Sequence, residues 1–240
     1  MERQILTVAH NRDLNDSVFE LVLRGASPMR AGQFVEIRAE GFYLRRPISV
    51  TDSDGDRLFL LIKEVGEGTK TLRALRNGDK VDVITGLGNG FDLSAERPLL
   101  IGGGIGCAPL YMLAKEFAAK GIRPHAVLGF RNKGEIYYAD EFSEFCDVTI
   151  ATDDGSSGYR GNAVAAVKES GILFDRFYAC GPAVMLKSAA EAFPTGQISL
   201  EARMGCGFGV CMGCSIKTTG GFKRVCKEGP VFEASEVIWE

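Results

Sequence analysis

Four of the seven cysteines lie close together near the end of the 240-residue chain: Cys206, Cys211, Cys214 and Cys226. Their Cys-x₄-Cys-x₂-Cys spacing, with a fourth cysteine after eleven more residues, is typical of a plant-type [2Fe–2S] cluster. Glycines between the ligands let the backbone wrap around the irons and point amides at the sulfurs. Structural zinc, the alternative, more often uses two separated Cys-x₂-Cys pairs. We therefore expect these four thiolates to hold a [2Fe–2S] cluster.

A glycine-rich run marks a second place where chemistry is expected. It follows the apolar strand Leu99–Ile101 and precedes a helical stretch from Ala108 to Lys120. The run does not satisfy G-x-G-x-x-G, but it can bring backbone close to a pyrophosphate, with a helix N-terminus beyond it. The alternative is a turn in which glycine serves tight packing. We expect four of its glycines to contact a dinucleotide: Gly102, Gly103, Gly104 and Gly106.

Two other strand ends carry side chains suited to the same ligand, because ligands lie at the carboxyl ends of parallel strands. Cys180 follows the strand Phe177–Ala179 and could approach a nicotinamide; its alternative role is a buried small residue. Asp153 follows the strand Val148–Thr152. A carboxylate there accepts ribose hydroxyls and repels a 2′-phosphate, which favours NAD over NADP, although Arg131 or Arg160 could reverse that preference.

A third signal lies in the first half of the chain, in the run Arg45-Arg46-Pro47-Ile48-Ser49. An arginine beside a hydroxyl can meet a pyrophosphate and a flavin ring edge, respectively. The alternative is a surface arginine near a strand edge. Lys63 and the run Gly66-Glu67-Gly68-Thr69 follow, and the latter opens a short helix whose N–H groups can meet a phosphate. Two phosphate-compatible elements in one unit strengthen the flavin interpretation.

The elements that must position these residues fall into three parts. Residues 1–97 contain short β-branched or aromatic runs separated by turns, which predict an antiparallel β-barrel. These runs are Ile5–Val8, Val18–Leu23, Phe34–Ile37, Ile48–Thr51, Leu58–Lys63 and Val81–Ile84, with a turn at 52–56 and a helix at Thr69–Leu75. Residues 98–201 alternate strands and helices, which predicts a doubly wound parallel α/β sheet. Residues 202–240 form the cysteine-bearing segment, too rich in glycine to pack a core alone.

Composition excludes several classes of function. The net charge of −3 comes without a basic block, so we expect no nucleic-acid partner. Two histidines leave little room for a histidine triad. The longest apolar run, 98–114, contains glycine and proline and is no bilayer span, and the N-terminus has no signal pattern, so we expect a cytoplasmic protein without membrane contact. Cys146 should be an ordinary thiol in a surface segment, Glu141–Asp147.

Together these motifs resemble the ferredoxin–NADP reductase superfamily. The appended cysteine segment narrows the resemblance to the electron-transfer subunits of NAD-dependent dihydroorotate dehydrogenase B, and the similarity spans nearly the whole chain. It rests on four runs: Leu44–Ser49, Gly86-Leu87-Gly88-Asn89-Gly90-Phe91, Glu201–Gly207 and Val225–Phe232.

The resemblance implies FAD bound by Arg46, Pro47, Ile48, Ser49, Leu61, Ile62, Lys63, Gly68 and Thr69. It also implies a partner subunit that carries FMN and the dihydroorotate site, in a two-plus-two heterotetramer that serves pyrimidine (UMP) biosynthesis. Electrons would then pass from FMN through the cluster to FAD and on to NAD⁺. A flavin is needed because the cluster carries single electrons and nicotinamide accepts pairs.

Two other functions remain open at this stage. The same cofactors could serve a different complex, such as a ferredoxin-dependent transhydrogenase or a sulfhydrogenase. A different class is a non-catalytic module that holds zinc or senses redox state and binds a nucleotide for regulation. Flavin and iron–sulfur absorption bleached by NADH would exclude that module.

Overall fold

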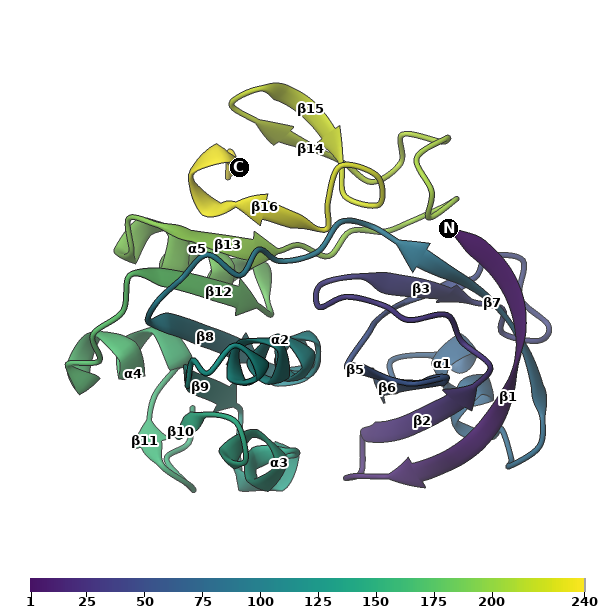
Figure 1. The fold of residues 1–240 in the computed structure, drawn as a ribbon, viewed down its shortest axis with the longest axis horizontal. Coiled ribbons are helices and arrows are strands. Elements are labelled where there is room, and N and C mark those ends of the chain that lie inside the picture. Colours follow the sequence, from purple (N-terminus) through teal and green to yellow (C-terminus); the bar gives the residue numbers. More distant parts are fainter. Residues whose placement is uncertain (240) are drawn as a thin grey trace.

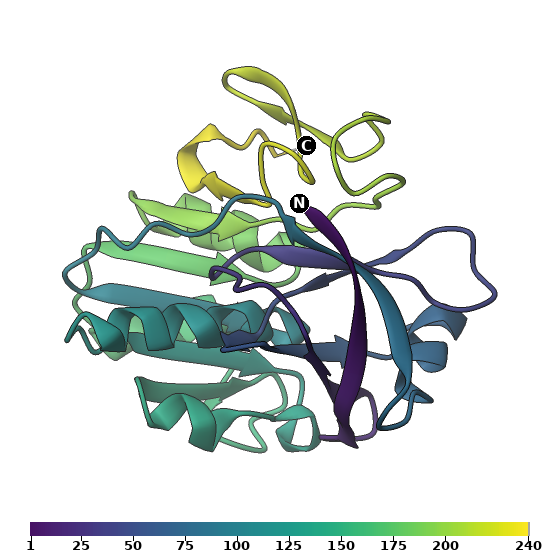
Figure 2. The ribbon, with the colours of Figure 1, turned by 45° about the vertical axis from the view of Figure 1, so that its right-hand side comes forward.

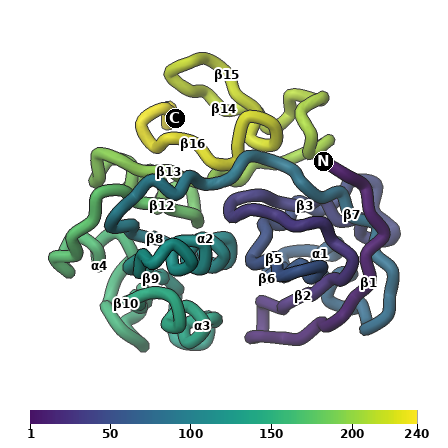
Figure 3. The backbone as a smooth tube through the Cα atoms, in the orientation of Figure 1, coloured from purple at the N-terminus to yellow at the C-terminus, as the bar shows by residue number. Residues whose placement is uncertain are grey.

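The computed structural model describes residues 1–239, whose strands form two seven-stranded sheets and one two-stranded hairpin. Figure 1 shows the first sheet and the second sheet as two neighbouring units, with the C-terminal segment lying across the same end of both. The backbone trace in Figure 3 follows the same path, and the link from β7 to β8 runs between the two units below that segment.

The first sheet is antiparallel and has the strand order β4-β3-β7-β1-β2-β6-β5. Its strands are β1 (Glu2–Asp13), β2 (Val18–Arg24), β3 (Phe34–Ile37), β4 (Arg46–Ser49), β5 (Asp52–Asp54), β6 (Arg57–Lys63) and β7 (Lys80–Leu87). Buried and more exposed residues alternate along β7, with Val81 and Val83 facing inward, as a strand with one face on a core requires. The sheet curls on itself in Figure 2, which confirms the predicted antiparallel unit. This curled sheet, together with α1, is called the barrel below.

The predicted turn at 52–56 is shorter than expected. The structure extends β5 through Asp54 and pairs it with β6. Gly55, with a φ of 61°, makes the tight reversal in the left-handed region, so fewer residues are needed for the turn. The predicted helix is α1 (Glu67–Arg73) and begins earlier than expected.

The second sheet has the order β11-β10-β9-β8-β12-β13-β16 and is parallel except for β16, which is antiparallel to β13. Its strands are β8 (Pro98–Gly103), β9 (His125–Phe130), β10 (Asp147–Thr152), β11 (Tyr159–Arg160), β12 (Arg176–Cys180), β13 (Gly196–Ser199) and β16 (Val231–Glu233). Its helices are α2 (Ala108–Ala119), α3 (Ala139–Ser143), α4 (Ala163–Ser170) and α5 (Ala183–Ala192), with 3-10 turns η1 (Gly104–Cys107) and η2 (Lys133–Glu135). The predicted α/β fold is confirmed.

Helices cover both faces of the second sheet, which explains why β8 is apolar throughout. Leu100 packs in the cluster that contains the residues of α2 and the barrel. Leu99 and Ile101 point the other way, into the cluster with α4 and α5. The barrel and the α2 face of the sheet therefore share one apolar core.

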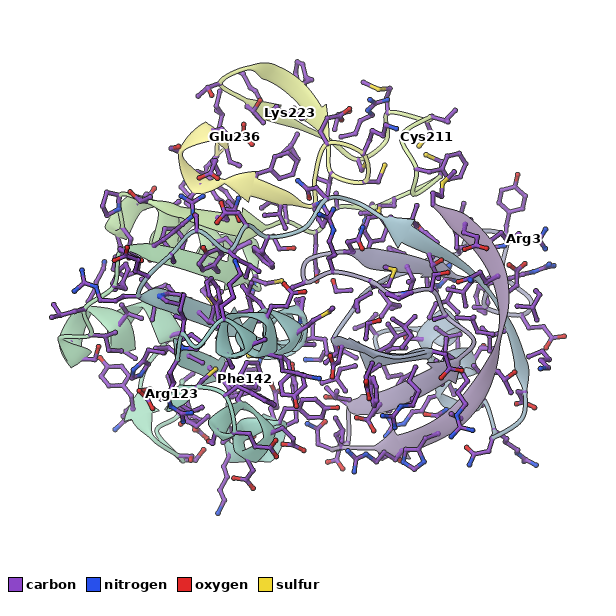
Figure 4. All side chains as sticks on the ribbon, viewed as in Figure 1. Arg3, Arg123, Phe142, Cys211, Lys223 and Glu236 are labelled. Carbon is purple, nitrogen blue, oxygen red and sulfur yellow. The ribbon has the colours of Figure 1, made fainter. Side chains whose placement is uncertain are left out.

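The cysteine-bearing segment contributes to the second sheet. It forms the hairpin β14 (Ser215–Thr218) and β15 (Gly221–Arg224), then β16, then the 3-10 turn η3 (Ala234–Glu236). Lys223 of the hairpin pairs with Glu236 at 2.6 Å, and Figure 4 shows these two side chains at the end of the molecule where the C-terminal segment lies. The segment is thus anchored to the second sheet through β16, and the Lys223–Glu236 pair joins its hairpin to η3.

The expected surface position of Cys146 is wrong. Cys146 is buried, because α3 and the turn after it fold Phe142 and Cys146 into the core shared with the barrel. Burial raises the pKa of the Cys146 thiol to about 12. Among the described residues, none of the helices combines the length and apolarity that a membrane crossing requires.

Candidate functional site

The first cavity, of about 320 Å³, lies between the barrel and the second sheet. Strands β4 and β6, helix α1 and turn η1 all contribute to its wall. Eight of the nine residues predicted to hold FAD line it: Arg46, Pro47, Ile48, Ser49, Leu61, Ile62, Lys63 and Thr69. The ninth, Gly68, lies behind Arg46. The structure therefore brings together residues from three separate segments that the sequence motifs singled out.

Gly68 leaves room for the Arg46 side chain. A Cβ atom on Gly68 would overlap the Arg46 guanidinium, so only glycine permits this arrangement. The guanidinium also stacks over the Phe42 ring at 4.7 Å and donates a 2.7 Å hydrogen bond to the Leu44 carbonyl. Arg46 is thus held with part of its donor set facing the cavity, as an arginine that meets a phosphate requires.

Thr69 fixes the loop that enters α1. Its hydroxyl accepts hydrogen bonds from the amides of Val65 at 3.0 Å and Gly66 at 3.2 Å, and donates to the Gly66 carbonyl at 2.9 Å. These bonds satisfy backbone groups that a helix start leaves without partners. Thr69 therefore shapes the rim of the cavity through the backbone.

The second cavity, of about 520 Å³, lies at the carboxyl edge of the parallel strands. Gly103, Gly104, Gly106 and Asp153 line it, together with Glu135 and Asn162. Two of the six residues predicted for the dinucleotide lie elsewhere. Gly102 is buried beneath η1, and Cys180 is a buried residue on the wall of the first cavity.

The glycines of the run have different roles. A Cβ on Gly102 would lie 2.6 Å from the Cys107 sulfur, and one on Gly103 would lie 2.6 Å from the Met185 sulfur. Gly106 packs against the backbone of Cys180. Gly104 has open space around it and a φ of 53°, so its need for glycine is conformational. Tight packing and an exposed ligand-facing turn therefore coexist in one segment.

The two cavities adjoin. Lys63, Ile105, Gly106 and Glu201 line both of them. Sequence reasoning did not single out Glu201 as a site residue, although it comes two residues after β13, at the strand edge where Asp153 was found. The strand-end rule applied to β13 would have found it.

The cysteine segment begins on the wall of the first cavity. Leu200, Glu201, Ala202 and Met204 line that cavity, and Cys206 comes two residues after the last of them. Figure 4 shows Cys211 in the C-terminal segment, beyond the barrel. The chain therefore leads directly from the junction of the two cavities to the four cysteines.

The structure pairs two of the four sulfurs. The Sγ atoms of Cys214 and Cys226 are 3.3 Å apart and both residues are buried, whereas Cys206 is half-buried and Cys211 is exposed. Across residues 1–239, no three His, Cys, Asp or Glu side chains stand close enough together to hold a metal ion. The geometry brings the predicted ligands into one loop and one neighbouring strand end, without closing a four-sulfur shell.

Backbone amides point at these sulfurs, which suits thiolate ligands. Val210 N donates to Cys206 Sγ at 3.2 Å, and Cys226 N donates to Cys214 Sγ at 3.4 Å. Partial burial opposes the thiolate of Cys206, but the amides of Cys211, Phe208 and Val210 outweigh it and lower the pKa of Cys206 to about 6. An all-sulfur donor set with amide donors fits an iron–sulfur cluster.

Glycines shape the loop as expected. Gly207 and Gly209 have φ values of 76° and 91°, which other residues rarely adopt. Gly207 packs on the buried carboxyl group of Glu36 on β3, and a Cβ on Gly205 or Gly213 would approach the Cys211 sulfur. Burial raises the pKa of Glu36 to about 7.

The chain is similar to one group of proteins over its whole length. Residues 201–238 match the iron-sulfur cluster binding domain of dihydroorotate dehydrogenase B. The chain is 41% identical to the dihydroorotate dehydrogenase B (NAD(+)) electron transfer subunit of Bacillus caldolyticus over 253 residues, covering 98% of both chains. Identity to the same subunit of Geobacillus thermodenitrificans (strain NG80-2) is 42%, again over 98% of both chains.

Solved structures agree with this. The NADH-dependent reduced ferredoxin-NADP oxidoreductase has a TM-score of 0.90 at 30% identity, covering 98% of this chain and 90% of that one. Phthalate dioxygenase reductase has a TM-score of 0.64 at 19% identity, covering 79% of this chain and 63% of that one, and shows the shared fold. The expected cofactors, FAD, [2Fe–2S] and NAD, accord with these matches, and the chain belongs to the family of electron transfer subunits of dihydroorotate dehydrogenase B (NAD(+)).

Proposed function

We propose that this chain passes electrons to NAD⁺ from a catalytic partner subunit, which oxidises dihydroorotate on its FMN. The proposed setting is pyrimidine biosynthesis in the cytoplasm. The proposed assembly is a heterotetramer of two such chains and two catalytic subunits. The observation that carries the proposal is the shared wall: two adjoining cavities have four lining residues in common, and the cysteine segment starts from that wall. Three redox sites can therefore follow one another along a short path.

In the first cavity, the proposed FAD site, Arg46 would hold the pyrophosphate and Ser49 would donate a hydrogen bond to the ring edge. The apolar side chains of Ile48, Leu61 and Ile62 exclude water from the ring. Bound FAD supplies the conversion between paired and single electrons that nicotinamide and an iron–sulfur cluster need between them.

In the second cavity, the proposed NAD site, the backbone of Gly103, Gly104 and Gly106 would hold the pyrophosphate. Asp153 accepts the ribose hydroxyls and repels a 2′-phosphate. Gly102 supports this turn from below and Cys180 supports it from the side of the first cavity. The residues common to both cavities would contribute to both cofactor sites.

The cluster is proposed to be held by Cys206, Cys211, Cys214 and Cys226, in a segment that runs from 202 to 240. Loading the cluster must draw the exposed Cys211 and the half-buried Cys206 toward the buried pair Cys214 and Cys226. The glycines of the loop permit that adjustment.

Flavin, iron and sulfide analysis of anaerobically purified protein tests the cofactor proposal. We expect one FAD and one [2Fe–2S] cluster per chain and an absorption spectrum that NADH bleaches. Cys214→Ser should lose iron and keep flavin, whereas Cys146→Ser, which alters a buried cysteine outside the site, should keep both. Colourless protein, or protein with zinc and no flavin, would contradict the proposal.

A second function is favoured by one observation, the 0.90 TM-score to the NADH-dependent reduced ferredoxin-NADP oxidoreductase. A chain of this fold could serve such a complex with the same cofactors. Mixing the purified holoprotein with an FMN-containing dihydroorotate dehydrogenase catalytic subunit separates the two. Dihydroorotate-dependent NADH formation supports the main proposal. Ferredoxin-dependent NADPH turnover without dihydroorotate-dependent NADH formation supports the second function.

A further inference from the structure

The run Gly86–Phe91 carries part of the family resemblance, yet none of its residues lines either cavity. It lies at the end of β7, where the chain leaves the barrel for the second sheet. This run contacts the cysteine-bearing segment, 139 to 142 positions further along the chain, through an asparagine side chain. A role in that contact explains why the run contains glycine and asparagine.

The side-chain amide of Asn89 binds the backbone of segment 228–231 with both its donor and its acceptor. Its Nδ2 donates to the carbonyls of Val231 at 2.8 Å and Glu228 at 3.1 Å, and its Oδ1 accepts from the Val231 amide at 3.0 Å. Its own amide donates to the Gly229 carbonyl at 2.7 Å. A side-chain amide supplies the donor and the acceptor together, as a paired strand would.

The glycines beside Asn89 let the two segments approach. A Cβ on Gly88 would lie 2.5 Å from Pro230 Cδ and 3.0 Å from the Phe34 ring, and Gly88 has a φ of 73°. A Cβ on Gly90 would lie 2.9 Å from the Ala31 carbonyl oxygen. A larger residue at Gly88 would push the link away from segment 228–231, and one at Gly90 would push it away from Ala31.

Segment 228–231 joins the proposed cluster site to the proposed flavin site. Cys226 lies two residues before it, and β16 starts with its last residue. Pro230 itself lines the first cavity beside Phe34, and its carbonyl accepts a 2.9 Å hydrogen bond from Leu200, another residue of that wall. A shift of this segment would therefore change the relation between Cys226 and the flavin cavity.

We infer that Asn89 is a positioning residue that fixes the cluster-bearing segment against the flavin cavity and so sets the electron path between the two cofactors. This inference rests on the proposed function for its electron-transfer part. Its structural part, that Asn89 holds segment 228–231 in place, rests on the observed hydrogen bonds alone.

The test uses the full-length holoprotein and three variants. Asn89→Ala removes every side-chain contact, and Asn89→Asp keeps the size while facing a carboxylate oxygen toward two carbonyls. Asn11→Ala is the matched control, because the Asn11 side chain also binds backbone carbonyls. Its Nδ2 donates to those of Leu72, Arg73 and Leu75, in and after α1, outside the cysteine-bearing segment. Rapid mixing with NADH then follows flavin and cluster reduction separately, and hydrogen exchange follows the Val231 amide.

We expect both Asn89 variants to slow cluster reduction while flavin reduction keeps its rate. The Val231 amide should exchange roughly tenfold faster in Asn89→Ala, since it loses its acceptor. Asn11→Ala should change neither. Unchanged cluster reduction in both Asn89 variants, or equal slowing in Asn11→Ala, would overturn the inference. Protein without flavin or cluster would refute the proposed function instead. The exchange of the Val231 amide would still test whether Asn89 holds segment 228–231 in place.

Discussion

At the scale of single residues, the site depends on where a side chain is absent. The Arg46 guanidinium occupies the position that a Cβ on Gly68 would take, and the backbone of Cys180 does the same at Gly106. Each glycine lets a wall of one cavity approach another part of the chain. Replacement by alanine at such a position displaces a neighbour even where the backbone itself is unstrained.

Gly68→Ala should weaken FAD binding without destabilising the fold. The added methyl group displaces the Arg46 guanidinium from the cavity, while alanine is favoured over glycine inside α1. Loss of a charged hydrogen bond predicts about 10- to 100-fold weaker binding. Fluorescence titration of the apoprotein with FAD measures this, with a thermal melt alongside.

Gly66→Ala is the control for that prediction. Its Cβ would meet nothing within 4 Å, and its φ of 178° is open to any residue. Equal FAD affinity in the two variants would show that Arg46 does not need the space that Gly68 provides.

Asp153→Ser should improve the use of NADPH. Asp153 lines the second cavity, where its charge would repel a 2′-phosphate. Removal of one such charge predicts a rise of about tenfold in the ratio of kcat/KM for NADPH to that for NADH. The neighbouring Asp154 is not part of the cavity wall and accepts hydrogen bonds from Ser156 N and Oγ at 2.9 and 2.6 Å. Asp154→Asn should leave the preference as it is, and a similar shift there would argue against a specific role of Asp153.

At the scale of elements, the sequence predicted those whose pattern is long or uniform. Phe34–Ile37 was predicted to the residue as β3, and the apolar run Leu99–Ile101 lies inside β8. Strand β16 was missed because Val231–Glu233 is three residues long and shows no periodicity. Its place is decided by pairing with β13, a partner that a local pattern does not reveal.

Asp82 on β7 joins two other elements of the barrel. It accepts 2.8 Å hydrogen bonds from Arg3 on β1 and from Arg45 in the link before β4. The bond from Arg3 is the largest cause of the lowered pKa of Asp82, which is about 2, and Arg45 adds to it. Since Arg45 precedes Arg46, this cluster also anchors the entrance to the proposed flavin site.

Asp82→Asn should destabilise the protein at neutral pH, and the difference should vanish in acid. A carboxyl group whose pKa is lower in the folded than in the unfolded chain stabilises the fold above the unfolded value. That contribution, about 1 kcal/mol after allowance for solvent screening, is lost as pH falls from about 4 to about 2. Urea unfolding of both proteins across that range measures the difference.

The control for Asp82 is Asp54→Asn, which breaks an exposed ion pair with Arg57. Exposed pairs contribute little, so this variant should unfold like the wild type at every pH. A difference between wild type and Asp82→Asn that persists unchanged at the acid end would show that the effect is not that of the ionised carboxylate.

At the scale of the whole molecule, the sequence predicted which segments form the site but not how they meet. The eight predicted residues on the first cavity sit on neighbouring elements of the barrel, so their motifs are local. Cys180 lines that cavity, whereas Gly181 and Pro182, the next residues after β12, line the second one. Pro230 joins the site through the sheet pairing of β13 and β16, which a local motif does not encode.

The surface of the whole molecule indicates where a partner subunit can approach. Val210 and Met212 are exposed apolar side chains within the four-cysteine loop. An apolar surface beside a redox centre suits a protein interface, because a partner must come close to the cluster. The proposed catalytic subunit is therefore expected to cover this loop.

Met212→Asp should abolish assembly with the catalytic subunit while flavin and cluster absorbance stay intact. Met212 is 53% exposed and has a φ of 60°, which aspartate tolerates well, so the substitution adds a charge to the surface without backbone strain. An unpaired charge in an apolar interface centre costs enough to prevent a stable complex. Leu173→Asp is the control, since Leu173 is 78% exposed in the link between α4 and β12, outside the cysteine-bearing segment. Size-exclusion chromatography of each variant with the FMN subunit separates the outcomes: a complex that forms equally well with Met212→Asp would place the interface elsewhere, and loss of assembly in both variants would point to a general effect of added charge.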